Sequence, residues 1–242
     1  MREVIWHDLE CGAYDADLPL WRALAAAEGG PVLDLGAGTG RVALDLAAAG
    51  FEVVALDREQ VFLDALDARA EIAGVGERIE TVAGDARTFE LGERRFPLIL
   101  APMQTVQLFG GPDGRGAFLR SVRRHLAPGG LMAAALADAL EGFDAEHTEP
   151  PLPDIVELDG WVYVSQPLAV RPGDDGTAIE RIRQWVSPDG RREAEGDTIV
   201  LDVLTADQLT AEGVAAGLRD AGRTSVEQTE EHVGSEVVLL RG

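Results

Sequence analysis

The stretch that most constrains this chain is residues 31–41, with the sequence PVLDLGAGTGR. Val32–Leu35 is a short apolar run that predicts a buried strand, and residues 42–49, rich in Ala and Leu, predict a helix. Between them stand glycines at alternate positions: Gly36, Gly38 and Gly40. Glycine has no Cβ, so the backbone can turn sharply there and a ligand can lie against it. The helix N-terminus then offers free N–H groups and a partial positive charge to a carboxylate or phosphate.

Two kinds of ligand bind to a strand, glycine turn and helix that follow one another in this way. A dinucleotide site has the spacing G-x-G-x-x-G, whereas this chain has G-x-G-x-G, with Arg41 where the third dinucleotide glycine would stand. Residues 52–56 predict the next strand, which ends in Asp57. A carboxylate at that position accepts hydrogen bonds from a ribose diol. On these residues a nicotinamide dinucleotide and S-adenosylmethionine both remain open.

Four motifs in order resemble the class I S-adenosylmethionine-dependent methyltransferases. Residues 32–40 resemble the family's first motif, and Asp57 occupies the position of the family's ribose-binding acid. Residues 84–86 (Gly-Asp-Ala) occupy the position at which the family contacts adenine, and residues 126–131 resemble the family's turn before the fifth strand. The resemblance covers about residues 10–140 and is looser beyond. It implies an α/β fold: a Rossmann-like, seven-stranded, mostly parallel sheet with an antiparallel last strand, helices on both faces, and a small antiparallel lid sheet.

The resemblance also implies which side chains contact S-adenosylmethionine. In the family an aromatic residue of the lead-in approaches the sulfonium, an acid before the glycine turn reaches the amino group, and the residues after the third strand contact adenine. The implied cofactor-binding residues here are Tyr14, Asp34, Gly36, Gly38, Gly40, Asp57, Arg58, Asp85, Ala86, Ala101 and Met103.

Several of these residues have a structural interpretation as well. Tyr14 is equally explained as a half-buried packing residue, and Asp34 as a carboxylate that caps nearby backbone N–H groups, although for Asp34 the ligand role is favoured. Arg41 either helps to hold the methionine carboxylate or forms a salt bridge. The sequence leaves the choice for Tyr14 and Arg41 open.

The loop after the fourth strand, residues 101–108, lies beside the methyl group in this fold, so Gln104 and Gln107 are candidate substrate-binding residues. DNA adenine methyltransferases place Asn or Asp-Pro-Pro-aromatic here, and cytosine C5 enzymes need a Pro-Cys nucleophile. This chain has neither, which favours a small-molecule acceptor. Arg181 and Trp185, on the predicted lid strands, are further candidates. With Tyr163 they face either the substrate or the partner of a homodimer formed through the lid.

We expect a single domain over residues 1–242, with a helical lead-in at 1–30 and a lid insertion at about 141–204. Asp17 is expected to cap a helix over 18–28. Residues 141–158, rich in Pro and acid, predict a loop, and strands are expected at 161–164, 178–186 and 197–204. A capping box at Thr205–Gln208 predicts the next helix, and a closing hairpin is expected at 224–230 and 236–240.

The chain of 242 residues has a net charge of −22 and contains no lysine. Its field repels phosphate polymers, so neither DNA nor RNA is expected as a substrate. The only tight cationic cluster, Arg120, Arg123 and Arg124, is expected to form the solvated face of a helix. Cys11 is the only cysteine, which excludes an intrachain disulfide and a Cys/His metal cluster, and no metal is predicted. No signal peptide or membrane-spanning run is visible, so a cytoplasmic location and no membrane partner are expected.

The expected reaction transfers a methyl group from S-adenosylmethionine, leaving S-adenosylhomocysteine, to a nitrogen or oxygen of a small molecule. Weak candidates for a catalytic base are His147, His232 and Tyr14, and the sequence commits to none of them. The histidines, including His125 at a helix end, are more simply explained as solvated surface residues. Two alternatives remain: a non-catalytic S-adenosylmethionine-binding regulatory protein and, less favoured, an NAD-dependent oxidoreductase.

Overall fold

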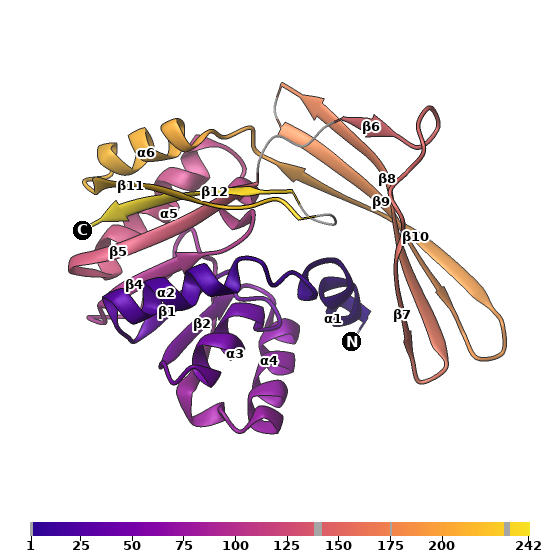
Figure 1. The fold of residues 1–242 in the computed structure, drawn as a ribbon, viewed down its shortest axis with the longest axis horizontal. Helices are drawn as coiled ribbons and strands as arrows, with labels where there is room; N and C mark the ends of the chain where they lie inside the picture. Colours follow the sequence, from indigo (N-terminus) through magenta and orange to yellow (C-terminus); the bar gives the residue numbers. More distant parts are fainter. Residues whose placement is uncertain (1, 138–141, 175, 230–232) are drawn as a thin grey trace. The chain divides into compact units, whose positions relative to one another are not determined.

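A computed structural model describes residues 2–137, 142–174, 176–229 and 233–242 (Figure 1). The chain divides into two compact units. One, called here the seven-stranded unit, comprises residues 14–138 and 204–242, and the other, the five-stranded unit, comprises residues 1–13 and 139–203.

The seven-stranded unit contains the sheet that the sequence predicts. Its strand order is β3-β2-β1-β4-β5-β12-β11. The first five strands in this order run parallel to one another, whereas β12 runs antiparallel to β5 and β11 antiparallel to β12. The strands are β1 Val32–Leu35, β2 Val53–Asp57, β3 Ile79–Ala83, β4 Phe96–Ala101, β5 Leu126–Ala137, β11 Arg219–Val226 and β12 Ser235–Arg241. The predicted α/β fold with a reversed last strand is confirmed.

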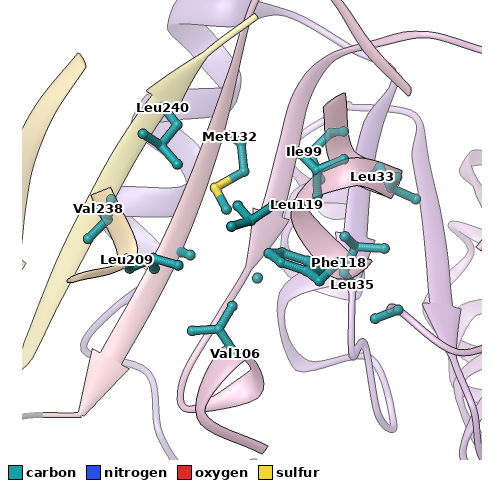
Figure 2. Packing of buried hydrophobic residues seen from close by; sticks show 14 of the residues in the cluster. Leu33, Leu35, Ile99, Val106, Phe118, Leu119, Met132, Leu209, Val238 and Leu240 are labelled. Carbon is teal, nitrogen blue, oxygen red and sulfur yellow. The ribbon is translucent and has the colours of Figure 1, made fainter. Parts of the chain in front are cut away.

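Helices cover both faces of this sheet, because alternate residues of the central strands point to opposite sides. Leu33 and Leu35 of β1 pack in one core with Phe118 of α5 and Leu209 of α6, as Figure 2 shows. Val32 packs in a second core with residues of α2 and α3. The helices are α2 Leu18–Glu28, α3 Arg41–Ala48, α4 Gln60–Ala73, α5 Pro112–His125 and α6 Ala206–Ala215, with short 3₁₀ turns at Gly76–Arg78 and Thr105–Leu108.

Local signals set most of these boundaries. Gly74 ends α4 with φ of +69°, as expected for a glycine after a helix, and the capping box at Thr205 and Gln208 is formed. The Pro-Gly-Gly turn at 128–130 falls inside β5, where the pairing with β4 shifts register. β11 begins at Arg219, five residues before the predicted start at 224, because an irregularity after Asp220 interrupts its alternation.

The five-stranded unit is an antiparallel sheet of order β10-β9-β8-β6, in which β7 also pairs with β8. The strands are β6 Phe143–Asp144, β7 Asp154–Leu158, β8 Trp161–Gly173, β9 Gly176–Val186 and β10 Arg192–Leu201. The prediction of a loop over 141–158 is therefore wrong for β6 and β7. β8 also continues beyond the predicted 164, and its pairing with β9 shifts between Pro167 and Ala169, because proline has no N–H to donate to the ladder.

The N-terminal segment of the five-stranded unit is helical, with α1 at Arg2–His7 followed by a π-helix at Asp8–Gly12. Trp6 of α1 packs against Tyr163 in an edge-on contact, with ring centroids 5.4 Å apart, and against Trp185 at 6.2 Å. Glu10 accepts two hydrogen bonds from the guanidinium of Arg183, at 2.7 and 2.8 Å. Of the helices the structure describes, none is both long and apolar enough to cross a membrane.

Candidate functional site

The glycine turn lies at the carboxyl end of β1, in the middle of the parallel strands. Gly36, Gly38 and Gly40 all have positive φ, at +74°, +55° and +97°, a region that side chains other than glycine rarely adopt. The N–H groups of Gly36 and Ala37 both donate to the Leu56 carbonyl, at 2.8 and 3.0 Å. The turn is therefore fixed to the end of β2. The first N–H groups of α3, residues 41–43, have no acceptor within the helix and remain for an anionic group.

The Asp57 carboxylate fastens the same turn from the end of β2. One oxygen accepts the Gly38 N–H at 2.8 Å, and the other accepts the Glu59 N–H at 2.9 Å. Each carboxylate oxygen has about two acceptor positions, so both keep capacity for a further donor such as a ribose hydroxyl. Asp57 thus has a structural role that the sequence did not reveal, alongside the predicted ribose role.

Neighbouring side chains explain why two turn positions must be glycine. A Cβ at Gly36 would lie 2.8 Å from Cγ2 of Thr105, which follows β4. A Cβ at Gly40 would overlap Cδ1 of Leu66 in α4. At these two positions the absence of a side chain is required by the packing of the protein itself, in addition to any approach of a ligand.

Asp34 is the most unusual side chain near the turn. It lies in β1, is 1% exposed, and neither of its carboxylate oxygens has a hydrogen-bond partner among the described residues. Burial raises the pKa of Asp34 to about 7; Arg41 opposes this rise, and Asp57 and Asp17 add to it. A buried polar group without a partner is costly, so this carboxyl group is suited to receive a donor from a ligand. The alternative that it caps backbone N–H groups finds no support in these contacts.

Arg41 forms a salt bridge, one of the two roles that the sequence left open. Its guanidinium binds both carboxylate oxygens of Asp17, at 2.8 Å for Nη2, and donates to the Tyr14 carbonyl at 2.8 Å. Asp17 makes no side-chain bond to the N-terminus of α2, so its predicted capping role is wrong. The helix was predicted at the correct position, but a partly buried arginine from a different element binds the Asp17 carboxylate.

Tyr14 packs inside the seven-stranded unit, where it is 5% exposed, and the Arg41 guanidinium lies 5.1 Å from the centre of its ring. Burial raises the pKa of the Tyr14 phenol, Asp17 raises it further, and a hydrogen bond with Ser235 lowers it. A phenol with a raised pKa is protonated at pH 7, which suits it poorly to act as a base. The packing interpretation of Tyr14 therefore gains support.

The predicted adenine-binding residues follow β3. The Asp85 carboxylate accepts the Arg87 N–H at 2.8 Å and pairs with the Arg87 guanidinium, and these bonds lower the pKa of Asp85. Ala86 is buried in the core. Arg58, next to Asp57, is largely exposed and pairs with Glu59 at 3.1 Å. Strand pairing brings the ends of β2 and β3 together, since Asp57 is the register partner of Ala83.

The loop after β4 contains the remaining candidates of this unit. Ala101 is fully buried at the end of β4, and Met103 adopts φ of +53°, which costs a non-glycine residue about 1–2 kcal/mol. Gln104 precedes the 3₁₀ turn and is partly exposed. The side-chain oxygen of Gln107 instead accepts the Ala137 N–H at 2.8 Å. Gln107 thereby holds the end of β5, a contact between residues 30 positions apart that has no local signal.

Arg181, Trp185 and His147 belong to the five-stranded unit. Trp185 is buried against Trp6, and Arg181 donates to Asp154 and Ser165, both at 3.2 Å. Both side chains therefore make contacts within their own unit. His147 is exposed, with Nδ1 3.9 Å from the Asp144 carboxylate, and His232 lies outside the described residues.

His125 corrects the expectation that the histidines are solvated. It is fully buried, its ring stacks on Phe89 with centroids 5.0 Å apart, and Nε2 accepts the Leu91 N–H at 3.3 Å. Nδ1 lies 3.0 Å from the Arg94 carbonyl and donates to it. Both ring nitrogens are therefore occupied by partners within the core.

A mostly parallel sheet with a reversed β12, a glycine turn after β1 and an acid at the end of β2 define the class I methyltransferase fold. Residues 32–130 match a family model described as a methyltransferase domain. The chain therefore has the fold of solved S-adenosylmethionine-dependent methyltransferases, and its residues 32–130 carry the methyltransferase-domain match.

Individual proteins share this resemblance to different extents. A cypemycin N-terminal methyltransferase from Streptomyces sp. is 34% identical over 129 residues, which are 52% of this chain and 51% of that protein. The match thus spans about half of that curated relative. The glycopeptide N-methyltransferase MtfA, solved with S-adenosylmethionine, is 27% identical with a TM-score of 0.57, over 93% of this chain and 95% of that one. The sugar N-methyltransferase KedS8 from Streptoalloteichus sp. shares the fold, with a TM-score of 0.72 at 17% identity, over 100% of this chain and 93% of that one.

Proposed function

We propose that this protein binds S-adenosylmethionine at the carboxyl edge of the parallel strands and transfers its methyl group to an amino nitrogen of a small-molecule acceptor. The observation that carries the cofactor assignment is the buried, unpartnered carboxyl group of Asp34 beside the glycine turn. The choice of nitrogen is supported by the glycopeptide enzyme, whose name states N-methylation, and by the cypemycin enzyme, whose name places its reaction at an N-terminus.

The residues present fit this ligand at each of its polar parts. The ammonium of the methionine portion can donate to Asp34, whose two oxygens have no partner among the described residues. The ribose hydroxyls can donate to Asp57, which keeps acceptor capacity beside its bonds to Gly38 and Glu59. The adenine amino group can donate to Asp85, two residues after β3, in exchange for part of the pairing of Asp85 with Arg87. Three acceptors therefore match three donor groups of the ligand.

Bound S-adenosylmethionine supplies an electrophilic methyl group on a sulfonium, and the chain's task is to hold and align it while excluding water. An amine acceptor needs only to lose a proton, so no strong base is required. This agrees with the protonated phenol of Tyr14 and with His125, both of whose ring nitrogens are occupied within the core. The net charge of −22 also favours the approach of a cationic ammonium over that of an anionic substrate.

Calorimetric titration tests the cofactor assignment. We expect S-adenosylmethionine and S-adenosylhomocysteine to bind at micromolar concentrations and NAD not to bind. Asp57→Ala should weaken binding by about 1–3 kcal/mol, which is about 5- to 150-fold. Asp67→Ala is the matched control, because Asp67 is exposed and its carboxylate accepts the Thr81 hydroxyl, at 3.1 Å, away from the glycine turn. Unchanged affinity in Asp57→Ala would show that Asp57 only fastens the turn.

Incubation with S-adenosylmethionine and a panel of amines and phenols tests the acceptor. Mass spectrometry should detect products that carry one additional methyl group on nitrogen. Methylation of phenols alone would refute the choice of nitrogen. Tight cofactor binding without turnover on a broad panel would favour the non-catalytic regulatory alternative, and binding of NAD alone would refute the methyltransferase assignment.

A further inference from the structure

A hollow of about 510 Å³ lies at the edge of the sheet opposite the glycine turn. Its lining comes from the segments that enter β4 and β5, from the end of α5 and from the ends of the β11–β12 pair: Arg95, Arg123, Arg124, Leu126, Pro128, Gly129, Arg219 and Gly242. The glycine turn follows the carboxyl end of β1, whereas this hollow lies at the amino ends of β4 and β5. β4 has six residues, and each adds about 3.3 Å, so roughly 20 Å of strand separates the two edges. All of these segments belong to the seven-stranded unit.

The lining is cationic in a strongly acidic chain. Four of its residues are arginines, although the chain has only 21 basic residues against 43 acidic ones. The Arg123 guanidinium donates to the Gly217 carbonyl at 3.1 Å, and Arg95 donates to the Arg94 carbonyl at 3.1 Å. Neither of these two arginines pairs with a carboxylate anywhere in the part of the chain that the structure describes. Their charges are therefore not neutralised by the protein.

The other charged groups around the hollow add little to this excess. Arg124 pairs with Glu90 at 2.8 Å, so it contributes little net charge. Arg219 donates to an oxygen of Gly242, the last residue, at 2.6 Å, and its charge is therefore not counted as surplus. The neighbouring Arg241 pairs with Glu28 at 2.6 Å and also donates to the Gly129 carbonyl. The surplus thus consists of two guanidinium groups, those of Arg95 and Arg123.

We propose that this hollow binds the phosphate group of a phosphorylated small molecule. A guanidinium offers several N–H donors in a planar fork that matches phosphate oxygens, and two unneutralised forks suit a dianion better than a single carboxylate. A volume of about 510 Å³ falls within the usual range for small-molecule sites, about 300–1,000 Å³. The net charge of −22 opposes a nucleic acid, because a polymer would also meet the acidic surface outside the hollow.

Titration of the full chain with pyrophosphate, phosphate and citrate at low salt tests the proposal. We expect saturable binding with the order pyrophosphate, phosphate, citrate, and a loss of affinity as salt is added. Arg95→Ala and Arg123→Ala should each lower the pyrophosphate affinity about tenfold, and Arg123→Lys should lower it less because the charge is kept. Arg120→Ala is the matched control: this exposed arginine lies on the same helix but outside the lining. Thermal unfolding of each variant checks that the fold is intact.

The outcomes separate the proposal from its alternatives. An equal loss of affinity in Arg120→Ala and Arg123→Ala would show general attraction to the helix and overturn it. Absence of saturation below about 10 mM pyrophosphate, which corresponds to a binding free energy weaker than about −3 kcal/mol, would also overturn the proposal. Binding of citrate more tightly than pyrophosphate would overturn it as well. A single-stranded oligonucleotide that binds more tightly than pyrophosphate, and that Arg123→Ala weakens, would show that the ligand is a nucleic acid. S-adenosylmethionine binding, measured in parallel, should be unchanged in all variants.

Discussion

Replacing Asp34 by asparagine should stabilise the protein at alkaline pH while weakening cofactor binding. Burial raises the pKa of Asp34 from its ordinary value of 3.8 to about 7. Between these values the folded chain holds a proton that the unfolded chain has lost, so stability falls as the pH rises through this window and is level above about 7. The ionised form is therefore the one that opposes folding.

The size of the effect follows from the same difference in pKa. Each pKa unit corresponds to about 1.4 kcal/mol, so above pH 7 the ionised Asp34 disfavours the folded state by about 4 kcal/mol. The asparagine side chain would not ionise, but its buried amide has two unpartnered N–H donors where the neutral carboxyl group has one O–H, at a further cost of about 1–3 kcal/mol. The net gain for Asp34→Asn at pH 8 is then about 1–3 kcal/mol. At pH 5 only about 1.5 kcal/mol of the ionisation penalty remains, and the gain disappears.

Thermal unfolding at pH 5 and pH 8 measures this directly. A gain of about 1–3 kcal/mol corresponds to roughly 2–12 °C in Tm for a chain of this size. Asp67→Asn, at an exposed position, should shift Tm by the same small amount at both values of pH. In calorimetry, Asp34→Asn should bind S-adenosylmethionine at least about tenfold more weakly, because a neutral amide replaces the carboxylate that faces the ammonium.

Two results would refute this reasoning. If Asp34→Asn lowers Tm at pH 8, the carboxylate is stabilised by contacts that the structure does not show. If the variant is more stable but binds S-adenosylmethionine as well as the wild type, the buried carboxyl group is not the acceptor for the amino group. The second result would remove the observation on which the cofactor assignment depends.

Two further changes test local packing. Gly40→Ala should lower Tm strongly, because a Cβ would overlap Leu66 and φ is +97°. Gly50→Ala is the control, because Gly50 has φ of +98° and open space around it. An equal loss of Tm in both variants would show that the effect comes from the backbone alone. Thr205→Ala should cost about 1 kcal/mol of unfolding free energy in urea denaturation, because the capping bond to the Gln208 N–H is lost, and an unchanged midpoint would contradict this.

The sequence predicts the seven-stranded unit well because its signals are local. Continuous apolar runs mark the buried parallel strands, and the glycines after β1 mark the turn by their backbone requirement. The five-stranded unit is harder to predict, since β7 follows three prolines within residues 150–153 and Ile155 is 60% exposed. A strand whose side chains stay exposed has no burial pattern to reveal it.

Side-chain roles that depend on distant partners could not be predicted either. Asp17 has the position of a helix cap, yet Arg41, 24 residues later, takes its carboxylate. His125 stands at a helix end where solvent is expected, yet the loop before β4 encloses it and satisfies both ring nitrogens. In both cases the position of the residue relative to its helix was predicted correctly. Its hydrogen-bond partner, however, is determined by the packing of the whole unit.

The charges around the glycine turn bear on which of the two ligands left open by the sequence is correct. Asp34 interacts with Arg41, Asp57 and Asp17, so three carboxyl groups share one guanidinium, which is already bound to Asp17. A dinucleotide would bring a pyrophosphate with two negative charges to this turn. S-adenosylmethionine brings an ammonium and a sulfonium, with a single carboxylate for the N–H groups of α3. A cluster of groups with surplus negative charge favours the ligand with surplus positive charge, and on this physical ground the methyl donor fits the glycine turn better than NAD.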